Sequence, residues 1–370
     1  MRITILALRN SIHTARWVNS LSERGYEIHL ISMHPSKHFI KPAVIQHDLE
    51  ISAPVGYYLN VWKVRQLLTQ FPPDLLHAHY ASGYGTLGWL SGFKPYIVSV
   101  WGSDVYEFPT RSSIHKFILE KNLSAAQWIC STSRAMAEQT LSLVPKLSNR
   151  LSVIPFGIDE TEFVPGLAAP DPDYLTIGTV KTLAIKYGID ILIRAFAIVN
   201  ERIKKSSPIF AEKLRLVIVG GPPHIAAEDH SSYLRELCTE LRINDKVKFI
   251  GPVDHKEVPR WLNTFDIYSI LSRRESFGVA VLEASACGLP VVVSDVGGLP
   301  EVVANGQTGT IVPSENPEYA AEALEQLIMD PSLRKRMGEN GREYVQQNYL
   351  WEKNVDEMEK IYNMVAMGSF

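Results

Sequence analysis

Cysteine is scarce in this sequence. Only three cysteines occur in 370 residues, Cys130, Cys238 and Cys287, and they are widely spaced, odd in number and set in apolar surroundings. This usage indicates neither a disulfide framework nor a zinc site. It favours a reducing compartment, and we expect a cytoplasmic protein.

Long hydrophobic runs are lacking as well. No segment reaches the ~18 uninterrupted apolar residues of a membrane span. The apolar run at the start, residues 3–8, is too short for a signal-peptide core and is typical of a first strand. A strong charge of one sign is also absent, since the net charge is -3, which argues against a general nucleic-acid-binding protein.

The composition that is present, 46% hydrophobic and 21% charged, is ordinary for a globular protein. A chain of 370 residues exceeds the ~250–300 at which single cores usually split, so two domains are expected. A proline-rich segment without periodicity, residues 164–174, is the best linker candidate. We therefore predict domains at residues 1–165 and 166–350, followed by an amphipathic helix within residues 351–370.

Short runs rich in valine and isoleucine alternate with helical patterns along most of the chain, which indicates βα units and parallel sheets. The predicted fold class is α/β, with two Rossmann-like domains facing a cleft, and ligands bind such sheets beyond the carboxyl ends of the strands. The predicted strands are residues 3–8, 27–32, 75–79, 96–101, 128–132 and 151–156 in the first domain, and 174–180, 214–221, 247–251, 267–271, 291–295 and 309–313 in the second.

One short helix is expected to begin beside the predicted cleft. Ser276 can cap a helix running from Phe277 to Cys287, with Gly288 just past its end. The free N–H groups of Phe277, Gly278 and Val279 would then form an anion site that fits a diphosphate.

Two glutamates flank this helix start. Glu275 precedes it, and Glu283 lies about 10 Å along the helix axis at ~1.5 Å per residue. Because a carboxylate accepts hydrogen bonds from paired hydroxyls, a ligand with a sugar at each end of a diphosphate satisfies both, with the hexose on Glu275 and the ribose on Glu283. Taken alone, the two residues are better explained as a solvated loop charge and an ordinary helix glutamate.

The segment ESFGVAVLEASACGLPVVVSDVGGLPEVV, residues 275–303, resembles the signature of retaining glycosyltransferases of family 4. The resemblance implies a GT-B fold, a last helix from Trp351 that crosses back to the first domain, and transfer of a hexose or N-acetylhexosamine from a nucleoside diphosphate sugar, with UDP preferred by the family. Further landmarks agree in order: residues 153–165, 178–196, 216–223, 247–253 and 305–313.

The resemblance implies a set of donor-site residues. Lys181 and Lys186 would neutralise the diphosphate and act with Glu275 in catalysis, although the family usually has an arginine where Thr179 stands, so Lys181 is a stand-in. No Asp-x-Asp motif occurs in a matching loop, so we expect no metal and no other cofactor. The remaining implied donor contacts are Gly221, Val253 on the base, Phe277, Gly278, Val279, Ala280 and Glu283, while Gly297 and Gly298 allow close backbone approach or form a plain tight turn.

The acceptor is expected on the first domain. Asn10 and His13 occupy a loop where relatives often have two glycines, and Trp101 and Asp104 lie where many have a histidine before Gly-x-Asp. No general base can be transferred to Trp101, and core packing is favoured for His77 and His79. This variant resembles bacterial enzymes that build O-antigen or capsule, which implies a glycan or polyprenyl-diphosphate-linked acceptor.

Three alternatives stay open. Residues 110–123, with Lys116 and Lys121, either contact an anionic membrane or cover a core. The protein is an enzyme or a non-catalytic nucleotide-sugar-binding subunit of a membrane complex. Within the same fold, an epimerase or phosphorylase is a second enzymatic alternative.

Overall fold

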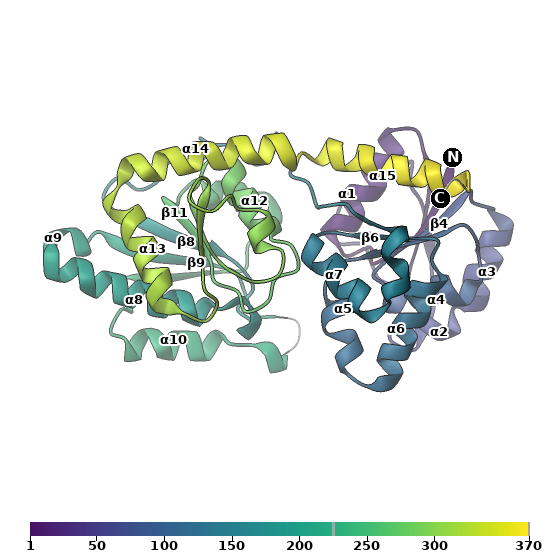
Figure 1. Cartoon of the computed structure of the whole chain (residues 1–370), viewed down its shortest axis with the longest axis horizontal. Helices are drawn as coiled ribbons and strands as arrows, with labels where there is room; N and C mark the ends of the chain where they lie inside the picture. Colours follow the sequence, from purple (N-terminus) through teal and green to yellow (C-terminus); the bar gives the residue numbers. More distant parts are fainter. Residues whose placement is uncertain (224–225, 369–370) are drawn as a thin grey trace. The chain divides into compact units, whose positions relative to one another are not determined.

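The computed structural model describes residues 1–223 and 226–368, and it divides into two compact units. Of these residues, 1–156 and 352–368 form the first unit, and those between 157 and 351 form the second. Figure 1 shows that each unit has a central sheet with helices packed around it. The predicted α/β class with two Rossmann-like domains is confirmed.

The sheet of the first unit is parallel throughout and, in the part of the chain that is described, has seven strands in the order β3-β2-β1-β4-β5-β6-β7. The strand order reverses between β1 and β4, which is where ligands bind in such sheets. The strands are β1 (Arg2–Leu6), β2 (Glu27–Ser32), β3 (Ile45–Asp48), β4 (Leu75–His79), β5 (Tyr96–Val100), β6 (Trp128–Ser131) and β7 (Leu151–Val153).

Helices cover both faces of this sheet, with α1 and α15 on one side and α4 and α6 on the other (Figure 1). The α-helices of the first unit are α1 (Ile12–Glu23), α2 (Gly56–Leu59), α3 (Val61–Gln70), α4 (Gly83–Ser91), α5 (Ser103–Tyr106), α6 (Ser113–Ala125), α7 (Arg134–Leu143) and α15 (Trp351–Ala366), with 3-10 turns η1 (Phe108–Thr110) and η2 (Pro145–Arg150).

The last helix, α15, belongs to the first unit from Glu352 onward. Arg24, at the end of α1, forms ion pairs with Glu352 at 2.6 Å and Asp356 at 2.5 Å, and it also pairs with Glu359. The hydroxyl of Tyr362 lies 2.8 Å from His77 Nδ1 on β4. The predicted return of the chain to its first domain is therefore confirmed.

The second unit repeats the plan with a parallel sheet that, within the described ranges, has six strands in the order β10-β9-β8-β11-β12-β13. Its strands are β8 (Leu175–Val180), β9 (Leu214–Val219), β10 (Val247–Gly251), β11 (Ile267–Ile270), β12 (Val291–Ser294) and β13 (Gly309–Val312). Its α-helices are α8 (Ile189–Ser206), α9 (Pro208–Ala211), α10 (Ser231–Glu240), α11 (Val258–Leu262), α12 (Val279–Ala286), α13 (Pro317–Met329) and α14 (Pro331–Asn348), with 3-10 turns η3 (Ile185–Tyr187), η4 (Ala226–Glu228), η5 (His255–Glu257) and η6 (Leu299–Glu301).

Candidate functional site

In the second unit, β8 and β11 are neighbours at the point where the strand order reverses, so the loops that follow them meet at one sheet edge. Lys181 directly follows β8, and Glu275 lies in the loop after β11. The Lys181 Nζ is 2.6 Å from the Glu275 Oε2, and the two side chains are only 14% and 11% exposed. The structure thus brings together a lysine and a glutamate that the sequence places 94 residues apart.

The environment of Lys181 keeps its ammonium group charged. Its Nζ lies 4.4 Å from the centre of the Tyr187 ring. Burial by itself lowers the pKa of Lys181, but the Glu275 carboxylate and Tyr187 outweigh that effect and raise the pKa above its ordinary value. The site therefore holds a fixed positive charge beside a carboxylate.

Two glycines let the loop that carries Glu275 pack closely against its neighbour. Gly297 has φ +51°, and a Cβ there would lie 1.8 Å from the Glu275 carbonyl oxygen. The Gly298 N–H donates to that same oxygen at 3.2 Å. Of the two roles expected for these glycines, the structure shows a turn that supports Glu275 by backbone contact.

A third glycine supports Lys181 in the same way. Gly220, after β9, has φ +147°, and a Cβ there would lie 1.9 Å from the Lys181 carbonyl oxygen. Its neighbour Gly221, expected at the donor, accepts a hydrogen bond from the Leu183 N–H at 2.9 Å. Gly221 also packs on Pro252, where an added Cβ would approach to 3.0 Å.

The helix expected from Phe277 is shorter than predicted. It runs from Val279 to Ala286, and its cap is Gly278 with φ +114° and ψ 39°, so the prediction that Ser276 caps it is wrong. The physical reason is that the chain turns through a left-handed residue, a conformation that glycine adopts at no steric cost. Phe277 is 2% exposed, so its side chain packs in the core.

Glu283 projects from α12 and is 7% exposed as a residue. Its Oε1 lies 3.3 Å from the Nε2 of His255, a residue that sequence reasoning missed. The other ring nitrogen, Nδ1, lies 3.8 Å from the Glu162 Oε1. The two carboxylates together raise the pKa of His255 to about 10. The only sequence signal for His255 was its position two residues after Val253, a half-buried residue in the turn expected to contact the base.

Lys186 lies in η3 and is less enclosed than Lys181. Its Nζ is 3.7 Å from the Glu228 Oε2, and its side chain is 33% exposed. Its backbone is held firmly, because its carbonyl oxygen accepts hydrogen bonds from the N–H groups of Arg273 at 2.9 Å and Arg274 at 3.3 Å. The Arg273 guanidinium also donates two hydrogen bonds, of 2.8 and 2.7 Å, to the Asp190 carboxylate at the start of α8. Sequence reasoning also missed this arginine, which links the loop that carries Lys186 to the loop that carries Glu275.

In the first unit, the residues expected on the acceptor side follow β1 and β5: Asn10 and His13 come after β1, and Trp101 and Asp104 come after β5. Trp101 is 8% exposed and lies in an aromatic cluster, with its ring centre 4.5 Å from His79 and 5.4 Å from Phe156. His13 stacks on Phe156 at 4.0 Å. The structure thus brings His13 and Trp101 together, with their rings edge to face at 5.9 Å and Phe156 in contact with both.

Asp104 is buried and orders two loops. Its carboxylate accepts hydrogen bonds from the backbone N–H groups of Ala81 and Gly102, both at 2.8 Å, and of Trp101 at 3.2 Å. Burial raises the pKa of Asp104, and the backbone donors oppose that shift. We infer from these bonds that the role of Asp104 is to fix the shape of the segments that follow β4 and β5.

The two histidines of β4 lie in the core, which was the favoured interpretation. His77 bridges Tyr362 and Ser99, each at 2.8 Å, and burial lowers its pKa to about 3. His79 is 1% exposed, and burial lowers its pKa well below the ordinary value. Both side chains are therefore neutral imidazoles at pH 7.

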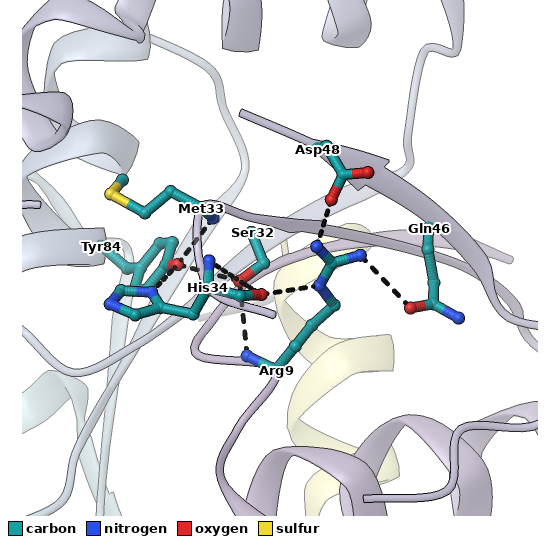
Figure 2. A network of polar contacts seen from close by, with 7 residues as sticks. All are labelled: Arg9, Ser32, Met33, His34, Gln46, Asp48 and Tyr84. Carbon is teal, nitrogen blue, oxygen red and sulfur yellow. Dashed lines mark hydrogen bonds and ion pairs between the residues drawn. The ribbon is translucent and has the colours of Figure 1, made fainter. Parts of the chain in front are cut away.

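The loop after β1 is held by the arginine that occupies the place of the usual glycine pair. Arg9 Nε donates to the His34 carbonyl oxygen at 2.9 Å, and its guanidinium pairs with Asp48 on β3 (Figure 2). Figure 2 also shows the Tyr84 hydroxyl meeting His34 Nδ1 at 2.8 Å. Asn10 follows in a half-buried turn just before α1.

The candidate membrane segment forms α6, which buries Leu119, Asn122 and Leu123 and exposes Ile114 at 70% and Phe117 at 55%. One face of the helix therefore covers the core. Across residues 1–223 and 226–368, the structure has no helix long and apolar enough to span a membrane. The same residues contain no cluster of His, Cys, Asp and Glu side chains suited to a metal ion.

Comparison with known proteins places this chain in a family. Residues 162–344 match the family described as glycosyl transferases group 1, and residues 2–133 match the glycosyl transferase 4-like family. A D-inositol 3-phosphate glycosyltransferase of Stackebrandtia nassauensis is 30% identical over 315 residues, which cover 77% of this chain and 67% of the relative. The chain belongs to the group 1 glycosyl transferases.

Further similarity extends over most of this glycosyltransferase. The N-acetyl-alpha-D-glucosaminyl L-malate synthase of Bacillus anthracis is 27% identical over 92% of this chain and 90% of that enzyme. Among solved structures, sucrose-phosphate synthase from Thermosynechococcus elongatus matches with a TM-score of 0.86 and 21% identity over 100% of both chains. Anabaena HepE in complex with UDP matches with a TM-score of 0.81 and 17% identity over 98% of this chain and 100% of that one. These structures confirm the GT-B fold. The two named relatives are not O-antigen enzymes by name, so the comparisons do not single out that subgroup.

Proposed function

We propose that this glycosyltransferase transfers a hexose or N-acetylhexosamine from a nucleoside diphosphate sugar, with UDP as the nucleotide, to an acceptor hydroxyl with retention of anomeric configuration. The observation that carries the proposal is the buried Lys181–Glu275 pair at the reversal point of the second sheet. A lysine ammonium group pairs with a diphosphate, and a carboxylate accepts hydrogen bonds from sugar hydroxyls. The two groups side by side therefore match a ligand in which a diphosphate is joined to a sugar. UDP is supported by its presence in the HepE structure.

The chemistry follows from where charge develops. When the sugar leaves, negative charge grows on the diphosphate, and fixed positive groups beside it lower the barrier. Lys181 supplies such a charge, Lys186 lies five residues further along the same loop, and the first N–H groups of α12 at Val279 and Ala280 add the positive end of the helix. We expect these groups to neutralise the diphosphate without a divalent cation.

The two glutamates divide the recognition of the donor. Glu275 accepts hydrogen bonds from the hexose, and Lys181 is then released from it to face the diphosphate. Glu283 accepts bonds from the ribose. Since no carboxylate is assigned as a covalent nucleophile, we propose that the bond between the anomeric carbon and the diphosphate oxygen breaks, that the acceptor hydroxyl attacks this carbon from the same face of the sugar, and that its proton passes to the departing diphosphate.

The acceptor is proposed to be a glycan or a polyprenyl-diphosphate-linked sugar in the synthesis of surface polysaccharide. A second candidate is a small anionic acceptor, favoured by the inositol phosphate and malate named in the two relatives. The aromatic cluster of His13, Trp101 and Phe156 is the acceptor-side feature of the first unit. Activity assays with acceptors of both classes, monitored through the release of UDP, separate the two candidates.

We also propose peripheral contact of α6 with an anionic membrane. Its exposed Ile114 and Phe117 lie beside Lys116 and Lys121, and the Lys121 Nζ sits 5.1 Å from the Phe117 ring centre. Replacing both lysines with glutamate should reduce co-sedimentation with anionic vesicles. Equal sedimentation of the variant and the wild type would remove this contact from the proposal.

The donor class is tested by thermal-shift binding of UDP, GDP, ADP and a panel of UDP-sugars in the absence of metal, beside Glu283→Ala. Selective stabilisation by UDP that weakens in the variant supports the ribose role of Glu283. Stabilisation by UDP without turnover of any UDP-sugar would instead favour the non-catalytic binding subunit. If no nucleotide stabilises the wild type, the proposed donor site is wrong.

A further inference from the structure

The carboxylate of Glu283 is already held by another side chain in this structure. Its Oε1 lies 3.3 Å from the His255 Nε2, and the Glu283 side chain is 9% exposed. Among residues 1–223 and 226–368, no group hydrogen-bonds its second oxygen, Oε2. One oxygen is therefore fixed by the protein, and the other is left for a ligand.

His255 is itself held from several directions. Its Nδ1 lies 3.8 Å from the Glu162 Oε1, and its ring meets Phe163 edge to face at 5.9 Å. Its backbone begins η5, a turn that Asp254 caps by accepting from the Lys256 N–H at 3.0 Å. The imidazole thus bridges three separate segments: residues 159–163, η5 and α12.

Both ring nitrogens of His255 face carboxylate oxygens. Only the imidazolium form carries an N–H on each nitrogen, so only this form can donate to Glu283 at 3.3 Å and at the same time form an ion pair with Glu162 at 3.8 Å. The pKa of His255, raised to about 10, agrees with this geometry. The charged form is therefore present throughout the neutral range, and His255 is a positively charged side chain held between two carboxylates.

We propose that His255 is a positioning residue that holds Glu283 by Oε1 and so presents Oε2 to the ribose of the donor. The inference rests on the proposed function, in which Glu283 binds the ribose. A carboxylate held in one orientation loses less conformational freedom on binding than a mobile one, so the contact with His255 contributes to affinity and to discrimination between ribose and deoxyribose. His255 touches no reacting atom in this scheme, and its effect passes through Glu283 alone.

The test compares the affinities of UDP and 2′-deoxy-UDP by isothermal titration calorimetry. Wild type should prefer UDP, because the deoxy ligand leaves the oriented carboxylate without one hydroxyl donor. His255→Ala should bind UDP roughly tenfold more weakly, since an oriented hydrogen bond to a charged group is lost. Its affinity for 2′-deoxy-UDP should change much less, so the preference narrows.

Two further variants isolate the role of the imidazole. His255→Gln keeps one N–H donor toward Glu283 and should restore part of the preference for UDP. Lys256→Ala alters the next residue of the same turn, whose side chain is exposed, and should bind both ligands as the wild type does. If His255 had a purely structural role, its replacement would lower the affinities for both ligands alike. The ratio of the two affinities is therefore the deciding quantity.

The outcomes separate this inference from the function on which it rests. If Glu283→Ala loses UDP binding while His255→Ala and His255→Gln keep the wild-type preference, the positioning role is wrong and the donor site stands. If the wild type does not bind UDP, or if Glu283→Ala binds it as tightly as the wild type, the ribose role of Glu283 fails and the positioning role fails with it. Circular dichroism of each variant shows whether a lost affinity reflects a lost fold.

Discussion

The buried pair of Lys181 and Glu275 allows a quantitative prediction for the ligand-free protein. Lys181→Met removes the ammonium group while keeping an apolar side chain of similar length. It leaves Glu275 as a carboxylate that is 11% exposed and has lost its partner at 2.6 Å. The stability of the second unit should therefore fall sharply.

The expected loss can be worked from the burial of the pair. Removing one partner of a buried ion pair costs about 3–5 kcal/mol, and the residual exposure of both groups favours the lower end. A loss of about 3 kcal/mol corresponds to a decrease of roughly 6–12 °C in the midpoint for a unit of this size. The double variant Lys181→Met with Glu275→Gln should recover much of that loss, because the uncompensated charge is removed.

Differential scanning calorimetry of the wild type, both single variants and the double variant provides the assay. The cycle should give a coupling of at least ~2 kcal/mol between the two positions, as expected for groups in direct contact. If Lys181→Met unfolds within about 1 °C of the wild type and the cycle shows no coupling, the pair does not form in solution as described.

The remaining predictions concern loop geometry and pH. Gly297→Ala should destabilise the protein by at least ~2 kcal/mol and abolish turnover of UDP-sugars, because its Cβ would collide with the Glu275 carbonyl oxygen in a left-handed conformation. Gly306→Ala, also at positive φ but in open space, is the matched control and should cost only about 1 kcal/mol by thermal melting. Because folding raises the pKa of His255 from 6.5 to about 10, its ion pairs contribute their full stability below pH 6.5 and lose it as the pH rises through about 10. The difference in melting temperature between wild type and His255→Gln should therefore be larger at pH 6.5 than at pH 10.5, and a gap that widens with pH would contradict this account.

The fold was largely predictable from the sequence because buried parallel strands are continuous apolar runs. β2 and β4, which are almost entirely buried, have the predicted bounds, and so does β10, an edge strand that still keeps apolar residues. β3 escaped prediction because it is an edge strand with the sequence IQHD, and most of its side chains are exposed. Such a strand is defined by its pairing with β2, which no local pattern records.

The site was predictable only in part. Lys181 and Glu275 were expected at one ligand, and the structure shows them in contact. The start of α12 was misplaced because a serine before Phe277 has the local pattern of a cap, while the helix is capped by Gly278, where an added Cβ would come within 3.0 Å of Leu299 and 3.1 Å of Val302. Packing across the fold overrides that local pattern.

The residues missed by the sequence analysis act through distant partners. His255 became notable only when Glu162 and Glu283 were brought to its two ring nitrogens. Arg273 likewise depends on Asp190, 83 residues earlier in the chain. Such roles arise from long-range contacts between loops, and local spacing carries no trace of them.

The most direct test of the donor site is the rate of UDP release from the UDP-sugar selected by thermal shift, measured for wild type and Glu275→Gln alongside their affinities for UDP. Glu275 contacts the sugar in this account while UDP is held by other residues, so turnover should fall at least ~100-fold. The dissociation constant for UDP should change by no more than about threefold, because Glu283 and the lysines remain. Wild-type turnover by Glu275→Gln would contradict the role assigned to the buried pair.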